Sequence, residues 1–210
     1  MIRALIADDH AVVRQGLKQI LGDTPEMVVA GEATTGQEVL DKVRAETWDV
    51  VVLDISMPDR SGLDVLKQLR SERPKLPVLV LSMHSEDQYA VRVLKAGASG
   101  YLTKDSAPDE LVKAIRKVVS GGRYVSSFLA EKLAFEIGTD SSRLPHETLS
   151  DREFQVLRLI AAGESVTEIA AELCLSVKTV STYRARMLEK MNLTTNAELM
   201  HYAMQNHLID

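Results

Sequence analysis

One short stretch constrains the fold of this chain more than any other: residues 50–54 read Val-Val-Val-Leu-Asp, an apolar run that ends in a carboxylate. Such a run is typical of a central parallel strand, which is buried on both faces. The residues that follow include Pro58 and Gly62 and cannot continue the strand. Asp54 is therefore predicted at the C-terminal end of a strand, where open α/β sheets bind their ligands.

Short apolar segments alternate with amphipathic ones over roughly the first 120 residues. Strands are expected at 4–7, 27–30, 50–54, 78–81 and 100–102. Helices are expected at 11–21, from the capping box at Thr35, at 63–69, at 86–95 and after Ser106. Five strand-then-helix repeats predict a doubly wound, five-stranded parallel sheet, because right-handed crossovers are what such spacing permits. We expect a flavodoxin-like α/β domain with strand order 2-1-3-4-5.

Polar side chains stand at the ends of four of these strands. Asp8 and Asp9 follow the first strand, and Asp54 closes the third. Ser82 ends the fourth, and Lys104 lies just past the fifth. In the expected order the first and third strands are neighbours, so three carboxylates converge in one crevice and repel each other. A hard divalent cation, Mg²⁺ above all, would relieve that repulsion through oxygen ligands.

This constellation resembles the receiver domain of two-component response regulators, over roughly residues 1–120. The resemblance implies that Asp54 accepts a phosphoryl group from a phosphohistidine of a sensor histidine kinase. It also implies that Asp9, Asp54 and the backbone carbonyl of Ser56 bind Mg²⁺, with Asp8 reaching the ion through water. Such a domain is not an enzyme acting on other substrates, because it catalyses only its own phosphorylation and dephosphorylation.

The resemblance assigns three further residues to the phosphoryl group. Lys104 would pair with the phosphoryl oxygens, Ser82 would donate a hydrogen bond to one of them, and Tyr101 would turn inward when Ser82 moves. These roles agree with the physics of phosphoryl transfer, which depends mainly on positioning and charge neutralisation. One position departs from the family pattern: many receivers follow the lysine with a proline in a cis peptide, whereas Asp105 stands here.

The alternation of strand-like and helix-like segments ends after Gly121-Gly122. A short amphipathic helix is expected at 128–137, and a polar, flexible stretch at 138–147. We therefore divide the chain into a domain at 1–121, a linker with a short helix at 122–147 and a second domain at 148–210.

The second domain is predicted to be all-α. Four capping residues open four helices, at Ser150, Ser165, Ser176 and Thr195. A short helix, the tight turn 174–176 and a longer helix at 177–191 form a helix-turn-helix, whose second helix lies in the DNA major groove. Cys174 has apolar neighbours and is expected to be a packed thiol.

A nucleic-acid partner would have to meet a local patch, because the formal net charge of the chain is −5. The helix 177–191 supplies one. We expect Ser181 and Thr182 to contact base edges. The expected phosphate contacts are Lys178, Thr179, Arg184 and Arg186. On a helical wheel the residues that face the core are Val180, Met187, Leu188 and Met191. Four cations in this helix, Lys190 included, predict a slope of log affinity on log salt near ~−7 for a dimer.

The segments 149–153, 168–170 and 175–180 together resemble the LuxR-type helix-turn-helix. With the receiver ahead of it, the chain resembles a NarL/FixJ-family response regulator over nearly its whole length. This implies a transcription factor that is phosphorylated on Asp54 and binds double-stranded promoter DNA as a homodimer on activation, with dimer contacts around 197–204. RNA polymerase is a further candidate partner. Tyr183 occupies a position that often holds histidine in the family.

Composition narrows the class of protein to which the chain can belong. A hydrophobic content of 45% and a charged content of 26% are those of an ordinary globular protein. One cysteine excludes an intramolecular disulfide, and no run reaches the ~18 apolar residues of a membrane span, so we expect a cytoplasmic protein. Two alternatives stay open. An aspartyl-phosphate hydrolase would usually carry a second acid where Ser56 stands, and a degenerate receiver would act only as a phosphate-independent dimerisation module.

Overall fold

The computed structural model describes residues 1–57, 60–83, 86–106, 108–126, 129–131 and 144–209. The chain divides into two compact units, Met1–Ala134 and Phe135–Asp210. Within the described ranges, no helix combines the length and apolar character that crossing a membrane requires.

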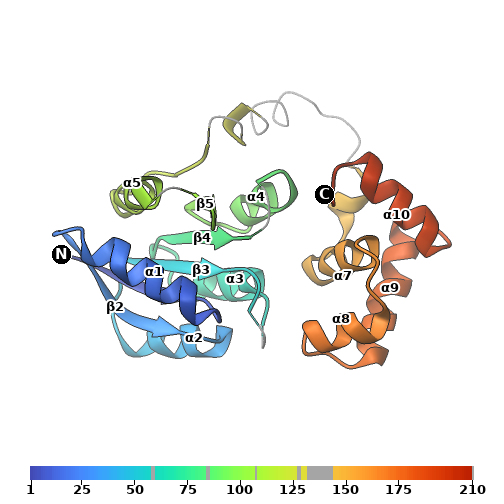
Figure 1. Ribbon diagram of the computed structural model, residues 1–210, viewed down its shortest axis with the longest axis horizontal. Helices are drawn as coiled ribbons and strands as arrows, with labels where there is room; N and C mark the ends of the chain where they lie inside the picture. Colours follow the sequence, from blue (N-terminus) through green and yellow to red (C-terminus); the bar gives the residue numbers. More distant parts are fainter. Residues whose placement is uncertain (58–59, 84–85, 107, 127–128, 132–143, 210) are drawn as a thin grey trace. The chain divides into compact units, whose positions relative to one another are not determined.

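The first unit is the predicted parallel sheet, with strand order β2-β1-β3-β4-β5 (Figure 1). Its strands are β1 (Ile2–Ala7), β2 (Met27–Ala33), β3 (Val50–Asp54), β4 (Val78–Ser82) and β5 (Gly100–Thr103). Its helices are α1 (Ala11–Gly22), α2 (Gly36–Ala45), α3 (Gly62–Glu72), α4 (Glu86–Lys95) and α5 (Pro108–Val119). The prediction of a doubly wound, five-stranded sheet in this order is confirmed.

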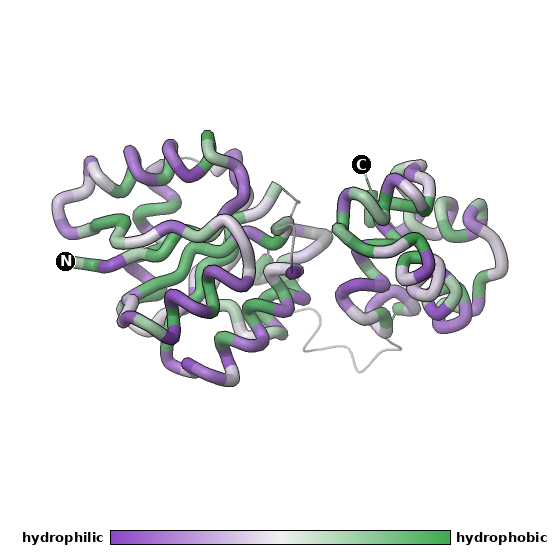
Figure 2. The backbone as a smooth tube through the Cα atoms, turned by 90° about the horizontal axis from the view of Figure 1, so that it is seen from below, coloured by the Kyte–Doolittle hydropathy of each residue, from purple (hydrophilic) through white to green (hydrophobic). Residues whose placement is uncertain are grey.

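Helices cover both faces of the sheet, which is why its strands are apolar without alternation. On one face Ile6 and Val52 pack with Leu17 of α1 and Ile115 of α5 in a single core cluster. The intervening residues, such as Val51, point to the opposite face and are also fully buried. Figure 2 shows these apolar strands in green, between helices in which hydrophilic and hydrophobic residues alternate.

The end of β3 is held by a close backbone contact with the start of α3. The amide of Gly62 donates a hydrogen bond to the carbonyl of Ile55 at 2.9 Å. A Cβ atom at residue 62 would lie 2.1 Å from the carbonyl oxygen of Asp54 and 2.7 Å from Cα of Ile55. Only glycine therefore allows α3 to begin so close to the residue at the C-terminal end of β3.

The second unit is all-α, as predicted. After the short 3₁₀ helix η1 (Pro145–Thr148) come α7 (Asp151–Ala161), α8 (Val166–Glu172), α9 (Val177–Met191) and α10 (Asn196–Gln205). The four predicted capping side chains all accept the expected backbone hydrogen bonds. Fully buried residues such as Phe154, Leu157, Val180 and Leu199 form the core. The helix-turn-helix prediction is confirmed by α8, a tight turn and α9.

Two sequence expectations differ from the structure. The polar stretch expected to run to residue 147 ends in η1, where the Leu144 amide donates to Glu147 Oε2 at 2.9 Å. Cys174 is exposed rather than packed, because it takes a left-handed turn conformation, with φ of 52°, after α8 has ended. Of the helix expected at 128–137, Leu129 to Glu131 are helical, and the rest lies outside the described residues.

Two glycine substitutions test the contact at the end of β3. We expect Gly62→Ala to destabilise the first unit by roughly 3 kcal/mol, since backbone atoms must move to admit the new methyl group. Gly16→Ala is the matched control, because Gly16 lies within α1 with open space around its Cα. It should stabilise the same unit by about 0.8 kcal/mol. Urea unfolding followed by the fluorescence of Trp48 measures both changes, and an equal effect of the two substitutions would contradict the packing described.

Candidate functional site

Three charged side chains from three strand ends meet in the first unit. Asp8 and Asp54 are each only 1% exposed. Lys104 follows β5, and its Nζ lies 2.8 Å from Asp54 Oδ2 and 2.6 Å from Asp8 Oδ2. The parallel sheet creates this meeting, because the C-terminal ends of β1, β3 and β5 lie at the same edge. The structure thus brings together the strand-end acids and the lysine expected from the sequence.

Burial and neighbouring charges shift the pKa values of Asp54 and Lys104. Burial raises the pKa of the Asp54 carboxyl, and the neighbouring Asp8 carboxylate raises it further, against the opposing influence of Lys104. Burial alone would lower the pKa of Lys104, but its bonds to Asp54 and Asp8 outweigh that effect and raise it. The pocket therefore holds a charged lysine, and burial disfavours ionisation of the Asp54 carboxyl group beside it.

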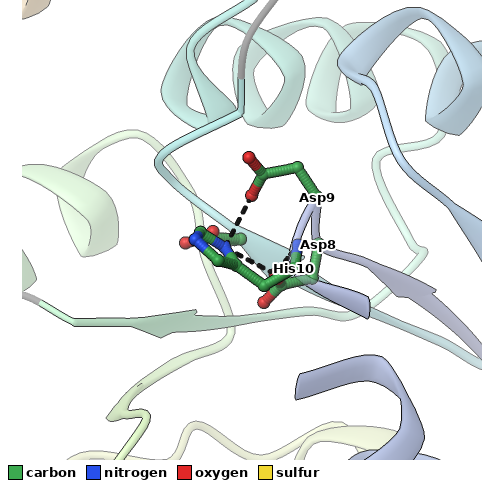
Figure 3. A group of neighbouring side chains, drawn as sticks. Asp8, Asp9 and His10 are labelled. Atoms are coloured by element: carbon green, nitrogen blue, oxygen red, sulfur yellow. Dashed lines mark hydrogen bonds and ion pairs between the residues drawn. The ribbon is translucent and has the colours of Figure 1, made fainter. Parts of the chain in front are cut away.

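Asp9 and His10 extend the pocket toward solvent. Asp8 Oδ1 accepts a hydrogen bond from the backbone amide of His10 at 2.8 Å. The imidazole Nδ1 of His10 lies 2.8 Å from Asp9 Oδ1 and 3.3 Å from Asp8 Oδ1, as Figure 3 shows. The side chain of Asp9 is one-third exposed, so it remains accessible to an ion from solvent.

The same residues form a candidate site for a divalent cation. One ligand atom from each of Asp8, Asp9, His10 and Asp54 lies within 4.8 Å of the others. Three carboxylates in such a group supply the oxygen donors that hard divalent cations prefer. Sequence reasoning singled out the three acids but missed His10, although its position directly after Asp8-Asp9 was the available signal.

The remaining expected residues of the site lie around Asp54. The backbone amide of Ser56 donates to Asp54 Oδ1 at 3.2 Å. Ser82 is fully buried at the end of β4, and its carbonyl accepts a hydrogen bond from the amide of Lys104 at 2.8 Å. Tyr101 is fully buried within β5. The peptide bond between Lys104 and Asp105 is trans.

The helix α9 presents the candidate nucleic-acid interface of the second unit. The four apolar residues expected to face inward are all buried: Val180, Met187, Leu188 and Met191. Among the residues expected to contact DNA, Lys178, Ser181, Thr182 and Arg186 are exposed. Thr179 and Arg184 are half-buried. Side chains in a row along an exposed helix face can reach both base edges and phosphates of a duplex.

Several of these side chains already have partners within the unit. Thr179 Oγ1 shares a hydrogen bond of 2.8 Å with Ser176 Oγ, and Thr182 Oγ1 donates to the carbonyl of Lys178 at 2.9 Å. Arg184 Nε donates to Asn196 Oδ1 at 2.7 Å, so this arginine also ties α9 to α10. The other two guanidinium nitrogens of Arg184 can still donate hydrogen bonds, and the side-chain amide of Asn196 is neutral and leaves the positive charge of Arg184 uncompensated.

Lys190 has a structural partner that sequence reasoning missed. Its Nζ lies 2.6 Å from Glu153 Oε2, in a carboxylate only 3% exposed on α7. Burial tends to raise the pKa of Glu153, but the bonds from Lys190 and from the Ser150 capping box outweigh it and lower the pKa. Lys190 therefore serves mainly to join α9 to α7, and its charge is compensated.

Comparison with known proteins identifies both units. Residues 4–116 match the response regulator receiver domain, and residues 147–203 match the bacterial regulatory proteins of the luxR family. The chain belongs to the two-component response regulators. Its receiver is followed by a LuxR-type DNA-binding domain, so the regulator has the family, fold and type of function that the sequence predicts.

Relatives over the whole length support this assignment. The response regulator is 39% identical to UvrY of Escherichia coli K12 over 209 residues, 99% of this chain and 96% of the relative. It is 40% identical to GacA of Pseudomonas protegens over 210 residues, 100% of this chain and 99% of the relative.

A solved structure of RcsB from Salmonella enterica serovar Typhimurium, bound to the promoter rprA in the presence of phosphomimetic BeF₃⁻, is also similar. It is 28% identical, with a TM-score of 0.67 over 97% of this chain and 99% of that chain.

Replacing Lys104 tests the electrostatic description of the receiver pocket. Lys104→Met leaves two buried carboxylates facing each other, and we expect a loss of roughly 3 kcal/mol in the free energy of unfolding near pH 7. Without the Lys104 ammonium, the raised pKa of Asp54 rises further. The loss of stability in Lys104→Met therefore grows as the pH increases above the ordinary pKa of a carboxyl group, and it disappears as the pH falls below it. Urea unfolding at several pH values, with and without Mg²⁺, measures this. A loss independent of pH and of Mg²⁺ would contradict the description.

Replacing Lys190 tests the contact between α7 and α9. We expect Lys190→Ala to lower the stability of the LuxR-type domain by about 1 to 2 kcal/mol at neutral pH, because Glu153 keeps a charge without its partner. Because the pKa of Glu153 is lowered in the folded state, the ion pair contributes its full stability above the unfolded-state pKa of Glu153. That stability is lost as the pH falls through the lower folded-state pKa. Hydrogen exchange of the amides in α7 and α9 reports the difference, which should vanish in acid.

Proposed function

We propose that Asp54 is the phosphoacceptor of this response regulator and that a sensor histidine kinase supplies the phosphoryl group. In the transfer, an oxygen of the Asp54 carboxylate attacks phosphorus in line, the bond from phosphorus to the imidazole nitrogen breaks, and the kinase histidine leaves. The observation that supports this assignment most strongly is the buried Asp54 at a strand end with Lys104 Nζ 2.8 Å away.

The acidic cluster fits a Mg²⁺ ion as the partner of this chemistry. Asp9, Asp54 and the carbonyl of Ser56 would bind it, and Asp8 would reach it through water. When bound, Mg²⁺ neutralises charge on the phosphoryl oxygens. A bound cation would also offset the two causes that raise the pKa of Asp54, which are burial and, to a lesser extent, the neighbouring Asp8 carboxylate.

Lys104 and Ser82 respond to the new phosphoryl group. Lys104 exchanges the Asp54 carboxylate for a phosphoryl oxygen, which carries more negative charge. Ser82 donates a hydrogen bond from its hydroxyl group to another phosphoryl oxygen. Tyr101, the aromatic residue expected to respond to Ser82, is already fully buried, so its response is a change within the core rather than a turn inward from the surface. The backbone amide of Lys104 donates a hydrogen bond to the carbonyl of Ser82. Movement of either residue therefore displaces the ends of both β4 and β5.

The LuxR-type domain then binds double-stranded promoter DNA as a dimer. The helix α9 enters the major groove with Ser181 and Thr182 toward base edges, while Lys178, Thr179, Arg184 and Arg186 contact phosphates. The exposed Met204 of α10 offers an apolar contact for the expected dimer interface. A two-fold dimer reads half-sites about 10 bp apart or a multiple of that. Such a regulator acts in the cytoplasm, with RNA polymerase as a further candidate partner.

The substitution Asp54→Asn tests the phosphoacceptor directly. We expect it to abolish incorporation from acetyl phosphate and to remove the effect of the phosphodonor on promoter footprints. Asp109→Asn, which changes an exposed carboxylate at the start of α5, is the control and should behave as the natural protein does. A variant at residue 54 that still responds to the phosphodonor would refute the proposal, as would DNA binding by the natural protein that ignores the phosphodonor.

The salt dependence of DNA binding tests the interface on α9. The ion pair of Lys190 with Glu153 leaves three uncompensated cations in α9, six in a dimer, and predicts a slope of log affinity on log salt near ~−5 instead of the ~−7 expected from four. Lys178→Ala should make that slope less steep by about 2, and Lys190→Ala should leave it unchanged. Binding isotherms at several salt concentrations measure both, and the reverse order of effects would place the DNA on another face.

A further inference from the structure

The two acids that follow β1 are held very differently. Asp8 is nearly fully buried, and it is fixed by Lys104 Nζ at 2.6 Å and by the His10 amide at 2.8 Å. Asp9 is partly exposed, and within the described ranges its carboxylate has one bonding partner, the imidazole Nδ1 of His10 at 2.8 Å. Figure 3 shows the His10 ring turned back toward the two carboxylates.

We propose that His10 is a positioning residue for metal binding: the contact of its Nδ1 with the Asp9 carboxylate would hold that carboxylate in place as a ligand of the ion. This rests on the proposed Mg²⁺ site. Carboxylate ligands are commonly fixed by such a second hydrogen bond, and its loss lowers metal affinity about 10- to 100-fold. The His10 side chain is 61% exposed, so the lower end of that range applies.

Metal affinity without any phosphodonor tests the role of His10. We expect His10→Ala to weaken Mg²⁺ and Mn²⁺ binding by about tenfold in titration calorimetry of the full chain. His10→Asn should recover most of that loss, because its amide can place an N–H donor near the position of Nδ1. His201→Ala, at an exposed histidine of α10, is the control and should bind as the natural protein does.

Three outcomes would overturn the role of His10. They are unchanged affinity in His10→Ala, no recovery in His10→Asn, and a nitrogen coupling to bound Mn²⁺ in electron spin-echo spectra, since that coupling would make His10 a direct ligand. Failure of the natural protein to bind either metal would instead remove the proposed Mg²⁺ site itself.

A second, independent set of contacts joins the segment after α5 to the receiver. The amide of Tyr124 donates to the carbonyl of Ser99 at 2.9 Å, and Tyr124 forms a parallel bridge with Gly100 of β5. A Cβ at residue 100 would lie 2.8 Å from the carbonyl oxygen of Tyr124, so this approach is close. Leu129 is fully buried. The first part of the predicted linker is thus packed onto the receiver.

Ser126 connects this segment to α4. Its hydroxyl oxygen accepts from the Leu129 amide at 3.1 Å, and its carbonyl accepts from the Ala130 amide at 3.0 Å, as at the start of a helix. The same hydroxyl donates to the carboxylate of Glu86, the first residue of α4. Glu86 lies four positions after Ser82, the residue expected to bind a phosphoryl oxygen.

We infer that the Glu86–Ser126 contact transmits the phosphorylation state of the receiver to the linker. A shift of Ser82 toward a phosphoryl oxygen displaces the start of α4, and with it the side chain that holds the beginning of the linker helix. The linker leads into the second unit, so the contact biases how readily the LuxR-type domain binds DNA. This inference rests on the proposed phosphorylation of Asp54.

The test measures DNA affinity of the full chain with and without beryllofluoride and Mg²⁺. Glu86→Ala leaves the cap on the linker helix in place, and we expect it to change the ratio of the two affinities by about fivefold, the lower end for coupled sites. Ser126→Ala should have a similar effect, and the double variant should add little to either single one. Ser120→Ala, at an exposed serine that bonds within α5, is the control.

Beryllofluoride binding separates the outcomes. All variants should still bind beryllofluoride in the absence of DNA, because none alters the residues of the pocket. The role of the contact would be overturned if both single variants kept the natural protein's ratio of DNA affinities with and without beryllofluoride. Strictly additive effects in the double variant would also overturn it. A natural protein that binds beryllofluoride but shows equal DNA affinity in both states would instead refute phosphorylation control of DNA binding.

Discussion

The receiver depends on one electrostatic arrangement, a lysine ammonium shared between two buried carboxylates. Lys104 lies within 2.8 Å of both Asp8 and Asp54, three groups that come from different strand ends and are almost entirely removed from solvent. A buried charge is tolerated only when it is paired, so loss of any one member leaves an uncompensated charge in the pocket, and any new charge changes the balance among the three. A cation beside the acids, or a phosphoryl group on Asp54, changes which partner Lys104 prefers.

The surrounding fold serves this arrangement by bringing the strand ends into register and keeping them there. The close contact of Gly62 with Asp54 fixes the loop after β3, and the bond between Lys104 and Ser82 couples β5 to β4. The same edge continues through Glu86 into the segment that follows α5. We infer that a local change in charge reaches the linker through the contact of Glu86 with Ser126.

Much of the fold was predictable because its signals are local. The unbroken apolar run before Asp54 predicts a strand buried on both faces, and the capping serines and threonines predict the helix starts in the second unit. The parallel sheet followed from the alternation of strands and helices, and the flavodoxin-like strand order expected for it placed Asp8 beside Asp54. The exposed face of α9 followed from its helical period.

The sequence could not show pairings that depend on tertiary packing. The partner of Lys190 lies on another helix, Glu153, and no local pattern assigns it. The orientation of the His10 ring toward Asp9 and the contact between Ser126 and Glu86 have the same origin. The exposure of Cys174 was mispredicted because apolar neighbours in sequence do not bury a side chain that sits in a left-handed turn.

The role of Lys104 as the shared partner of Asp8 and Asp54 is measured by following its ammonium group with nitrogen-detected NMR while Mg²⁺ and beryllofluoride are added to the full chain. Exchange of the Asp54 carboxylate for a fluoride predicts a large shift of the Lys104 Nζ resonance and a resolved coupling to fluorine, both absent in Asp54→Asn. An ammonium resonance that stays unchanged while beryllofluoride binds would contradict the account.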